Sequence, residues 1–127
     1  MSARALVLDA WGLIAIERAD RKVALLLDEA RRRRWPVLVP GAVMARVWRD
    51  GTRQVRLVRF LALGEVQIVA LDRAAAARIG ELLRVSRTSD VVDGAVVVCA
   101  KERRGVVLTS DPDDLLAPDP ALELIRM

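Results

Sequence analysis

Residues 89–111 read SDVVDGAVVVCAKERRGVVLTSD, and this stretch contains both patterns from which the fold can be predicted. Ser89 or Asp90 can cap a helix that runs to about Arg104 and is closed by Gly105. The apolar run at 106–108 follows at once and is typical of a strand that is buried on both faces. The stretch therefore predicts a helix followed directly by a strand.

The same alternation continues outward along the chain. Further apolar runs, each a strand candidate, lie at residues 5–8, 37–39, 66–71 and 122–125. Three segments with apolar residues at helical spacing lie between these runs and are helix candidates. One follows a possible cap at Asp20, one ends before Gly64, and one spans residues 74–83 after a possible cap at Asp72. Buried strands separated by helices predict an α/β fold: a three-layer α/β/α sandwich with a mostly parallel central sheet.

The size and composition predict one folded domain. The chain has 127 residues, of which 54% are hydrophobic and 30% charged, so we expect residues 1–127 to share a single core. No apolar run approaches the roughly 20 residues that cross a bilayer, and the N-terminus lacks a signal-peptide core. We therefore expect no membrane anchor. The single cysteine cannot close an internal disulfide, which fits the reducing cytoplasm.

Missing residue types exclude several kinds of catalysis. The chain has no histidine, which excludes Ser-His-Asp and Cys-His catalysis and histidine-ligated zinc. Its single cysteine, Cys99, cannot supply a multi-cysteine zinc site and is expected to be a small buried hydrophobe. Acid–base chemistry therefore falls to carboxylates, lysine or a metal-bound water.

Charge is divided unevenly between the two halves. Residues 1–63 hold thirteen Lys or Arg and six acids (+7), whereas residues 64–127 hold eight and eleven (−3). This division predicts a basic surface that attracts a polyanion, around an acidic pocket. In the basic half, the three- and four-residue spacing of Arg49, Arg53, Arg56 and Arg59 predicts a cationic stripe, either an RNA contact or a solvated helix face.

Four aspartates are predicted to meet at one edge of the sheet. Asp9 ends the first apolar run, Asp111 lies just past residues 106–108, and Asp90 and Asp93 lie three apart at the start of a helix. Ligands of open parallel sheets bind beyond the carboxyl ends of the strands. Taken singly, Asp9, Asp90 and Asp111 each also fit an ordinary helix cap, so the prediction rests on their joint placement.

Clustered carboxylates predict a hard divalent cation. They repel one another unless a cation neutralises them, and oxygen ligands without histidine or cysteine favour Mg²⁺ or Mn²⁺. Such an ion can activate water for attack on a phosphodiester. With a basic rim that attracts phosphates, the pattern predicts a metal-dependent nuclease.

Four motifs resemble those of the bacterial PIN domain family, in particular its VapC-type toxins. They are VLDA at 7–10, VPGAV at 39–43, SDVVDGAV at 89–96 and LTSDPD at 108–113. The resemblance implies a PIN-like ribonuclease that leaves 5′-phosphate and 3′-hydroxyl ends, usually dimerises and is inhibited by a cognate antitoxin. It further implies that Asp9, Asp93 and Asp111 bind Mg²⁺ or Mn²⁺, with Asp90 as an accessory catalytic carboxylate.

Two positions depart from the family pattern. Arg46 occupies the place of a glutamate on the helix after the second strand, and Trp11 that of a serine or threonine. Arg46 could pair with Asp9 or Asp93 and weaken metal binding, could clamp a substrate phosphate while Asp90 replaces the missing carboxylate, or could lie on a solvated face. Arg49 and Arg53 are further candidates for substrate binding.

Two rival functions remain open from the residues alone. The first is a weakened or inactive PIN-like module that binds RNA or an antitoxin because Arg46 has replaced the glutamate. The second is a phosphotransfer receiver domain, which the order of the acids and the position of Lys101 disfavour.

Overall fold

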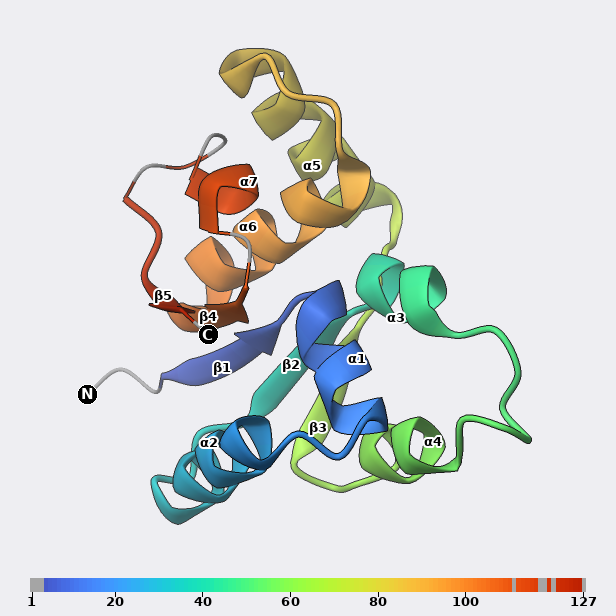
Figure 1. The fold of residues 1–127 in the computed structure, drawn as a ribbon. Coiled ribbons are helices and arrows are strands. Elements are labelled where there is room, and N and C mark those ends of the chain that lie inside the picture. Colours follow the sequence, from blue (N-terminus) through green and yellow to red (C-terminus); the bar gives the residue numbers. More distant parts are fainter. Residues whose placement is uncertain (1–3, 111, 117–118, 120, 127) are drawn as a thin grey trace.

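The computed structural model describes residues 4–110, 112–116, 119 and 121–126. Within these ranges, five strands form one parallel sheet in the order β3-β2-β1-β4-β5 (Figure 1). The strands are β1 (Ala5–Leu8), β2 (Val37–Pro40), β3 (Val66–Val69), β4 (Gly105–Thr109) and β5 (Leu124–Arg126). The predicted α/β class and parallel sheet are confirmed.

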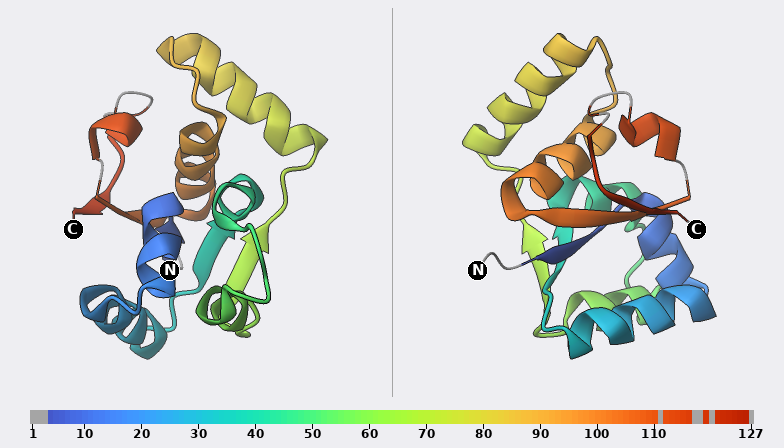
Figure 2. Two further views of the ribbon diagram at one scale, coloured as in Figure 1. Left: turned by 45° about the vertical axis from the view of Figure 1, so that its right-hand side comes forward. Right: turned by 90° about the vertical axis from the view of Figure 1, so that its left-hand side faces the viewer.

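Helices cover both faces of the sheet. They are α1 (Ala10–Glu17), α2 (Arg21–Arg32), α3 (Gly41–Val47), α4 (Val55–Leu61), α5 (Arg73–Ser86), α6 (Val91–Arg103) and α7 (Pro112–Leu116). Figures 1 and 2 show α1, α2 and α4 on one face and α6 on the other, with α5 packed outside α6. Helix α3 follows the carboxyl end of β2 and contacts both α1 and α6. None of the described helices is long and apolar enough to cross a membrane.

The three central strands are buried along their whole length. Every residue of β1, β2 and β4 is buried, because each strand has a neighbour on both sides and helices on both faces. Strand β3 differs from the prediction of a buried run at 66–71. It ends at Val69, and the side chains of Gln67 and Ile68 are exposed, because β3 is an edge strand and α5 packs on α6 instead of on it.

Aspartates begin four of the described helices. In each case the carboxylate accepts a hydrogen bond from the backbone N–H three residues later, which satisfies an otherwise unpaired donor of the first turn. The predicted caps at Asp20, Asp72 and Asp90 are confirmed, and Asp9 caps α1 in the same way.

Helix α6 ends differently from the prediction. Arg104, with φ of 54°, takes the left-handed capping conformation that was expected of Gly105. Gly105 instead begins β4, where a Cβ atom would overlap Cγ2 of Val7 and lie 3.2 Å from the Cα of Ala100. The glycine is required because strand and helix approach closely there, and not because of its φ angle.

Candidate functional site

The strand order creates a switch point between β1 and β4. The chain proceeds from β1 to β2 and β3 on one side, then returns to β4 and β5 on the other. Loops that leave β1 and β4 therefore diverge to opposite faces, and the region beyond the carboxyl ends at such a switch point is the usual ligand site of open parallel sheets. Asp9 directly follows β1, and Thr109 ends β4.

Asp9 is held firmly at this switch point. It is 8% exposed, and its Oδ1 accepts a hydrogen bond from the backbone N–H of Gly12 at 3.0 Å. Gly12 permits this tight first turn of α1, since a Cβ atom there would already lie 3.3 Å from the side chain of Leu8. The cap fixes one carboxylate oxygen and therefore orients the other.

The N-terminus of α6 brings two more acids to the same edge of the sheet. Helix α6 ends at Arg103, at the start of β4, so its first turn lies toward the carboxyl ends of the strands (Figure 2). Asp90 is exposed and caps α6, its Oδ1 accepting from the N–H of Asp93 at 3.0 Å. Asp93 is half-buried in the first turn, and the helix packs against β1, β2, β4 and α3.

The described acids do not form a metal site by themselves. Among the described residues, no group of three His, Cys, Asp or Glu side chains could hold a metal ion. Asp111, the remaining predicted ligand, lies outside the described residues. Asp9 and Asp93 fit a hard cation in chemical type, because both offer carboxylate oxygens at an edge that has no histidine. A site with three carboxylates would require Asp111 beside them.

Arg46 lies in the last turn of α3 and is exposed. No hydrogen bond or ion pair joins its guanidinium to another residue of the described ranges, so it is not paired with Asp9 or Asp93. The position leaves Arg46 open to solvent or to a ligand. Trp11, the second departure from the family pattern, is partly buried and packs against the core.

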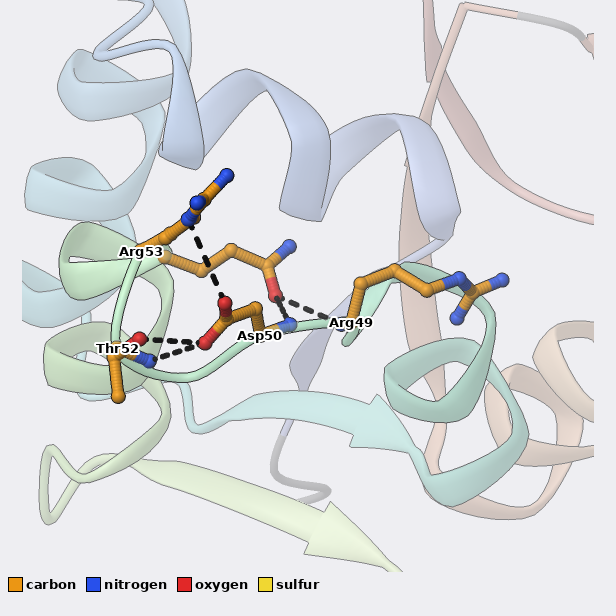
Figure 3. Close-up of polar contacts among 5 residues, drawn as sticks. Arg49, Asp50, Thr52 and Arg53 are labelled. Atoms are coloured by element: carbon orange, nitrogen blue, oxygen red, sulfur yellow. Dashed lines mark hydrogen bonds and ion pairs between the residues drawn. The ribbon is translucent and has the colours of Figure 1, made fainter.

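The predicted arginine stripe does not form on one helix. Helix α3 ends at Val47 and α4 begins at Val55, so only Arg56 and Arg59 share a helix. Figure 3 shows Arg49 and Arg53 in the connecting loop, with their side chains pointing in different directions. The Arg49 Nη1 donates to the backbone carbonyls of Ala45 (3.0 Å) and Trp48 (2.7 Å), which caps the end of α3.

The loop between α3 and α4 is held by side-chain hydrogen bonds that spacing alone does not reveal. The Oε1 atom of Gln54 accepts from the backbone N–H groups of Arg49 and Asp50 at 2.8 and 3.0 Å. Oδ1 of Asp50 in turn accepts from both the N–H and the hydroxyl of Thr52 (Figure 3). The hydrogen bonds from the hydroxyl and the N–H of Thr52 lower the pKa of the Asp50 carboxyl. Together with the bonds to Gln54, they order the loop.

Thr109 lies at the same edge of the sheet as Asp9, although it is not among the predicted site residues. Its side chain is fully buried at the carboxyl end of β4, opposite the end of β1. A sequence feature that could have identified Thr109 is its position, because it directly follows the apolar run at 106–108 and precedes Ser110 and Asp111.

Comparison with known proteins identifies the fold. No protein-family model and no curated protein sequence matches the chain. Among solved structures, it is similar to a chain of the VapBC2 complex from Rickettsia felis bound to promoter DNA, with a TM-score of 0.74 and 16% identity, covering 96% of this chain and 98% of that one. The fold is PIN-like.

Two further solved structures agree. A toxin–antitoxin complex from Klebsiella pneumoniae has a TM-score of 0.69 and 18% identity, covering 95% of this chain and 96% of that one. FitAcB from Neisseria gonorrhoeae has a TM-score of 0.67 and 17% identity, covering 95% and 96%. At such identities the similarity concerns the PIN-like fold, and it confirms the architecture expected from the sequence resemblance.

Proposed function

We propose that this chain is the toxin of a toxin–antitoxin pair and acts as a Mg²⁺- or Mn²⁺-dependent endoribonuclease. The observation that carries the proposal is the arrangement of acids at the switch point. Asp9 lies there buried and capped, and the first turn of α6 adds Asp90 and Asp93 at the same edge. The fold similarity to chains of toxin–antitoxin complexes supports it.

In this proposal, Asp9, Asp93 and Asp111 hold the ion and Asp90 is an accessory carboxylate. The ion would lower the pKa of an attacking water and neutralise the charge that develops on the scissile phosphate. The protein contributes rigid carboxylates: the cap to Gly12 fixes Asp9, and the packed first turn of α6 fixes Asp93. Such preorganisation is what a metal site needs from its protein ligands.

The proposed partners are RNA, a cognate antitoxin and a second copy of the chain. RNA fits the excess of arginine in residues 1–63, because a phosphate backbone is attracted by guanidinium groups. An antitoxin and a homodimer are inferred from the resemblance, and the fold neighbours belong to toxin–antitoxin complexes.

Replacing Asp93 with asparagine tests the proposal. Loss of one carboxylate should lower the rate of Mn²⁺-dependent RNA cleavage at least about 100-fold, measured on a labelled RNA by gel. Asp28→Asn is the matched control, because Asp28 is an exposed acid on α2, away from the switch point. Equal cleavage by the Asp93 and Asp28 variants would remove Asp93 from the mechanism.

The second candidate function is a weakened or inactive PIN-like module that binds RNA or an antitoxin. The exposed Arg46 on α3, where the family resemblance implies a glutamate, favours it. Arg46→Glu discriminates between the two. If Arg46→Glu greatly increases Mn²⁺ affinity and RNA cleavage, the metal site of the unmodified protein is weakened. If the unmodified protein and the variant cleave RNA equally well, the glutamate is dispensable here.

A further inference from the structure

A cleft lined by arginines lies at the end of α1 that is remote from Asp9. Its volume is about 290 Å³, and its lining residues are Glu17, Arg53, Gln54, Val55, Arg56 and Arg59. Glu17 is the last residue of α1, and Arg56 Nη1 lies 3.5 Å from its backbone carbonyl oxygen. Helix α4 packs directly against α1. The cleft is therefore part of the same body as the acidic edge.

The arginines of this cleft have few partners. Arg53 has a side chain 88% exposed and a long ion pair of 3.7 Å with Asp50. No hydrogen bond or ion pair joins the Arg59 guanidinium to another described residue. Three guanidinium groups so close together repel one another, and Glu17 is the one acid in the lining.

The arginines at the end of α2 show the opposite situation. Arg31 pairs with Glu65 at 2.6 Å, and Arg32 and Arg33 pair with Glu29 at 2.8 and 2.9 Å. Each of these three cations has a carboxylate partner within the protein, and Arg32 and Arg33 share Glu29. An arginine-rich segment can therefore pair its cations with acids of the same protein. The arginines of the cleft beside α4 have fewer such partners and remain available to bind an anion.

We propose that the cleft of Arg53, Arg56 and Arg59 binds the phosphate backbone of single-stranded RNA at a distance from the bond that is cut. The inference rests on the proposed ribonuclease function and adds a second contact to it. Helix α1 has eight residues, so the cleft lies about 12 Å along this helix from Asp9. A stacked strand advances about 3.4 Å per nucleotide, so three or four nucleotides would span this distance.

The lining favours a phosphate backbone over an acidic protein segment. Guanidinium groups bind phosphate oxygens in bidentate fashion, and the cleft offers three of them. A peptide of a protein partner would also need an apolar surface for its side chains. Val55 is the one aliphatic residue that the cleft provides.

Binding of a labelled 12-nucleotide single-stranded RNA in EDTA, followed by fluorescence anisotropy at several salt concentrations, tests the inference without requiring cleavage. We expect Arg53→Ala/Arg56→Ala/Arg59→Ala to reduce the slope of log K against log salt by about 2, since each phosphate contact on a single strand contributes about 0.7. The control is Arg31→Ala/Arg32→Ala/Arg33→Ala, which removes the same net charge and should leave the slope unchanged. Thermal unfolding by circular dichroism verifies that both variants fold.

Three results would overturn the inference. Equal losses in the two triple variants would indicate a general effect of net charge, and an unchanged slope in the cleft variant would show that RNA binds elsewhere or not at all. If the cleft variant instead kept its RNA affinity and lost binding to a 12-residue poly-glutamate peptide, the cleft would be a protein contact. The ribonuclease proposal is judged separately, by Mn²⁺-dependent cleavage and the Asp93→Asn variant.

Discussion

Leu8 of β1 and Leu108 of β4 are register partners in neighbouring parallel strands, although a hundred residues separate them in the chain. Because the strands are parallel, the residues that follow Leu8 and Leu108 leave the sheet at the same edge. Asp9 and Thr109 are these residues, and both are buried. The pairing of the two leucines therefore places the first acid of the chain beside the segment that leads to Asp111.

Asp9 and Asp20 provide a matched pair for testing this edge. Both cap a helix through Oδ1, at 3.0 and 3.1 Å, and asparagine caps a helix about as well as aspartate. We expect Asp9→Asn to lower Mn²⁺-dependent RNA cleavage at least about 100-fold, because a ligand charge is lost. Asp20→Asn should cleave like the unmodified protein. Similar activities of the two variants would contradict a role for Asp9.

Replacing Gly105 or Gly64 with alanine should change the free energy of unfolding in opposite directions. At Gly105 the new methyl group would overlap Val7 and crowd the backbone of Ala100, so Gly105→Ala should lower the free energy of unfolding by about 1–3 kcal/mol. At Gly64 nothing lies within 4 Å, and no described glycine has positive φ, so Gly64→Ala should raise it by about 0.4–1 kcal/mol. Urea unfolding midpoints measure both, and a tolerated alanine at 105 would disprove the close approach.

Arg87 ends α5 with φ of 58°, in the left-handed region that favours glycine. Arg87→Gly should stabilise the protein by about 0.5–1 kcal/mol, since the Cβ of arginine is strained there. Ala77→Gly, at an exposed position inside the same helix, should destabilise it by about 1 kcal/mol. Thermal unfolding followed by circular dichroism compares the two, and a loss of stability in both variants would argue against a strained cap.

Burial raises the pKa of the Cys99 thiol from 9.0 to about 11. The folded state therefore favours the neutral thiol, and this contribution to stability is complete below pH 9 and is lost as the pH rises from 9 to 11. We expect the free energy of unfolding to fall over this range by roughly 2–3 kcal/mol more than in Cys99→Ala. Parallel pH profiles of the two proteins would contradict this expectation.

The same burial predicts slow alkylation of Cys99. The thiolate is the reactive form, and the folded protein holds very little of it at pH 8. Iodoacetamide should therefore modify Cys99 much faster in urea than in buffer, as measured by mass spectrometry. Equal rates would show that the thiol is accessible in the folded protein.

Local features of the sequence were sufficient to predict many elements correctly. The caps at Asp20, Asp72 and Asp90 are helix starts because an aspartate precedes an apolar helical pattern, and this chemistry involves residues only three apart. The predictions failed where distant parts of the chain decide the outcome. Strand β3 is exposed at Ile68 because it is an edge strand, and a loop ordered by Gln54 separates Arg49 from the arginines of α4.

The amino-acid sequence by itself determined most of the strands and helices, and therefore the α/β class, because apolar spacing and helix caps act between near neighbours in the chain. It also determined that carboxylates would carry any acid–base chemistry, since no histidine is present. Only the tertiary structure decided that β1 and β4 are adjacent and that Asp9 is buried between their ends. Strand order depends on contacts between distant segments, and it is this order that brings together residues from opposite ends of the chain.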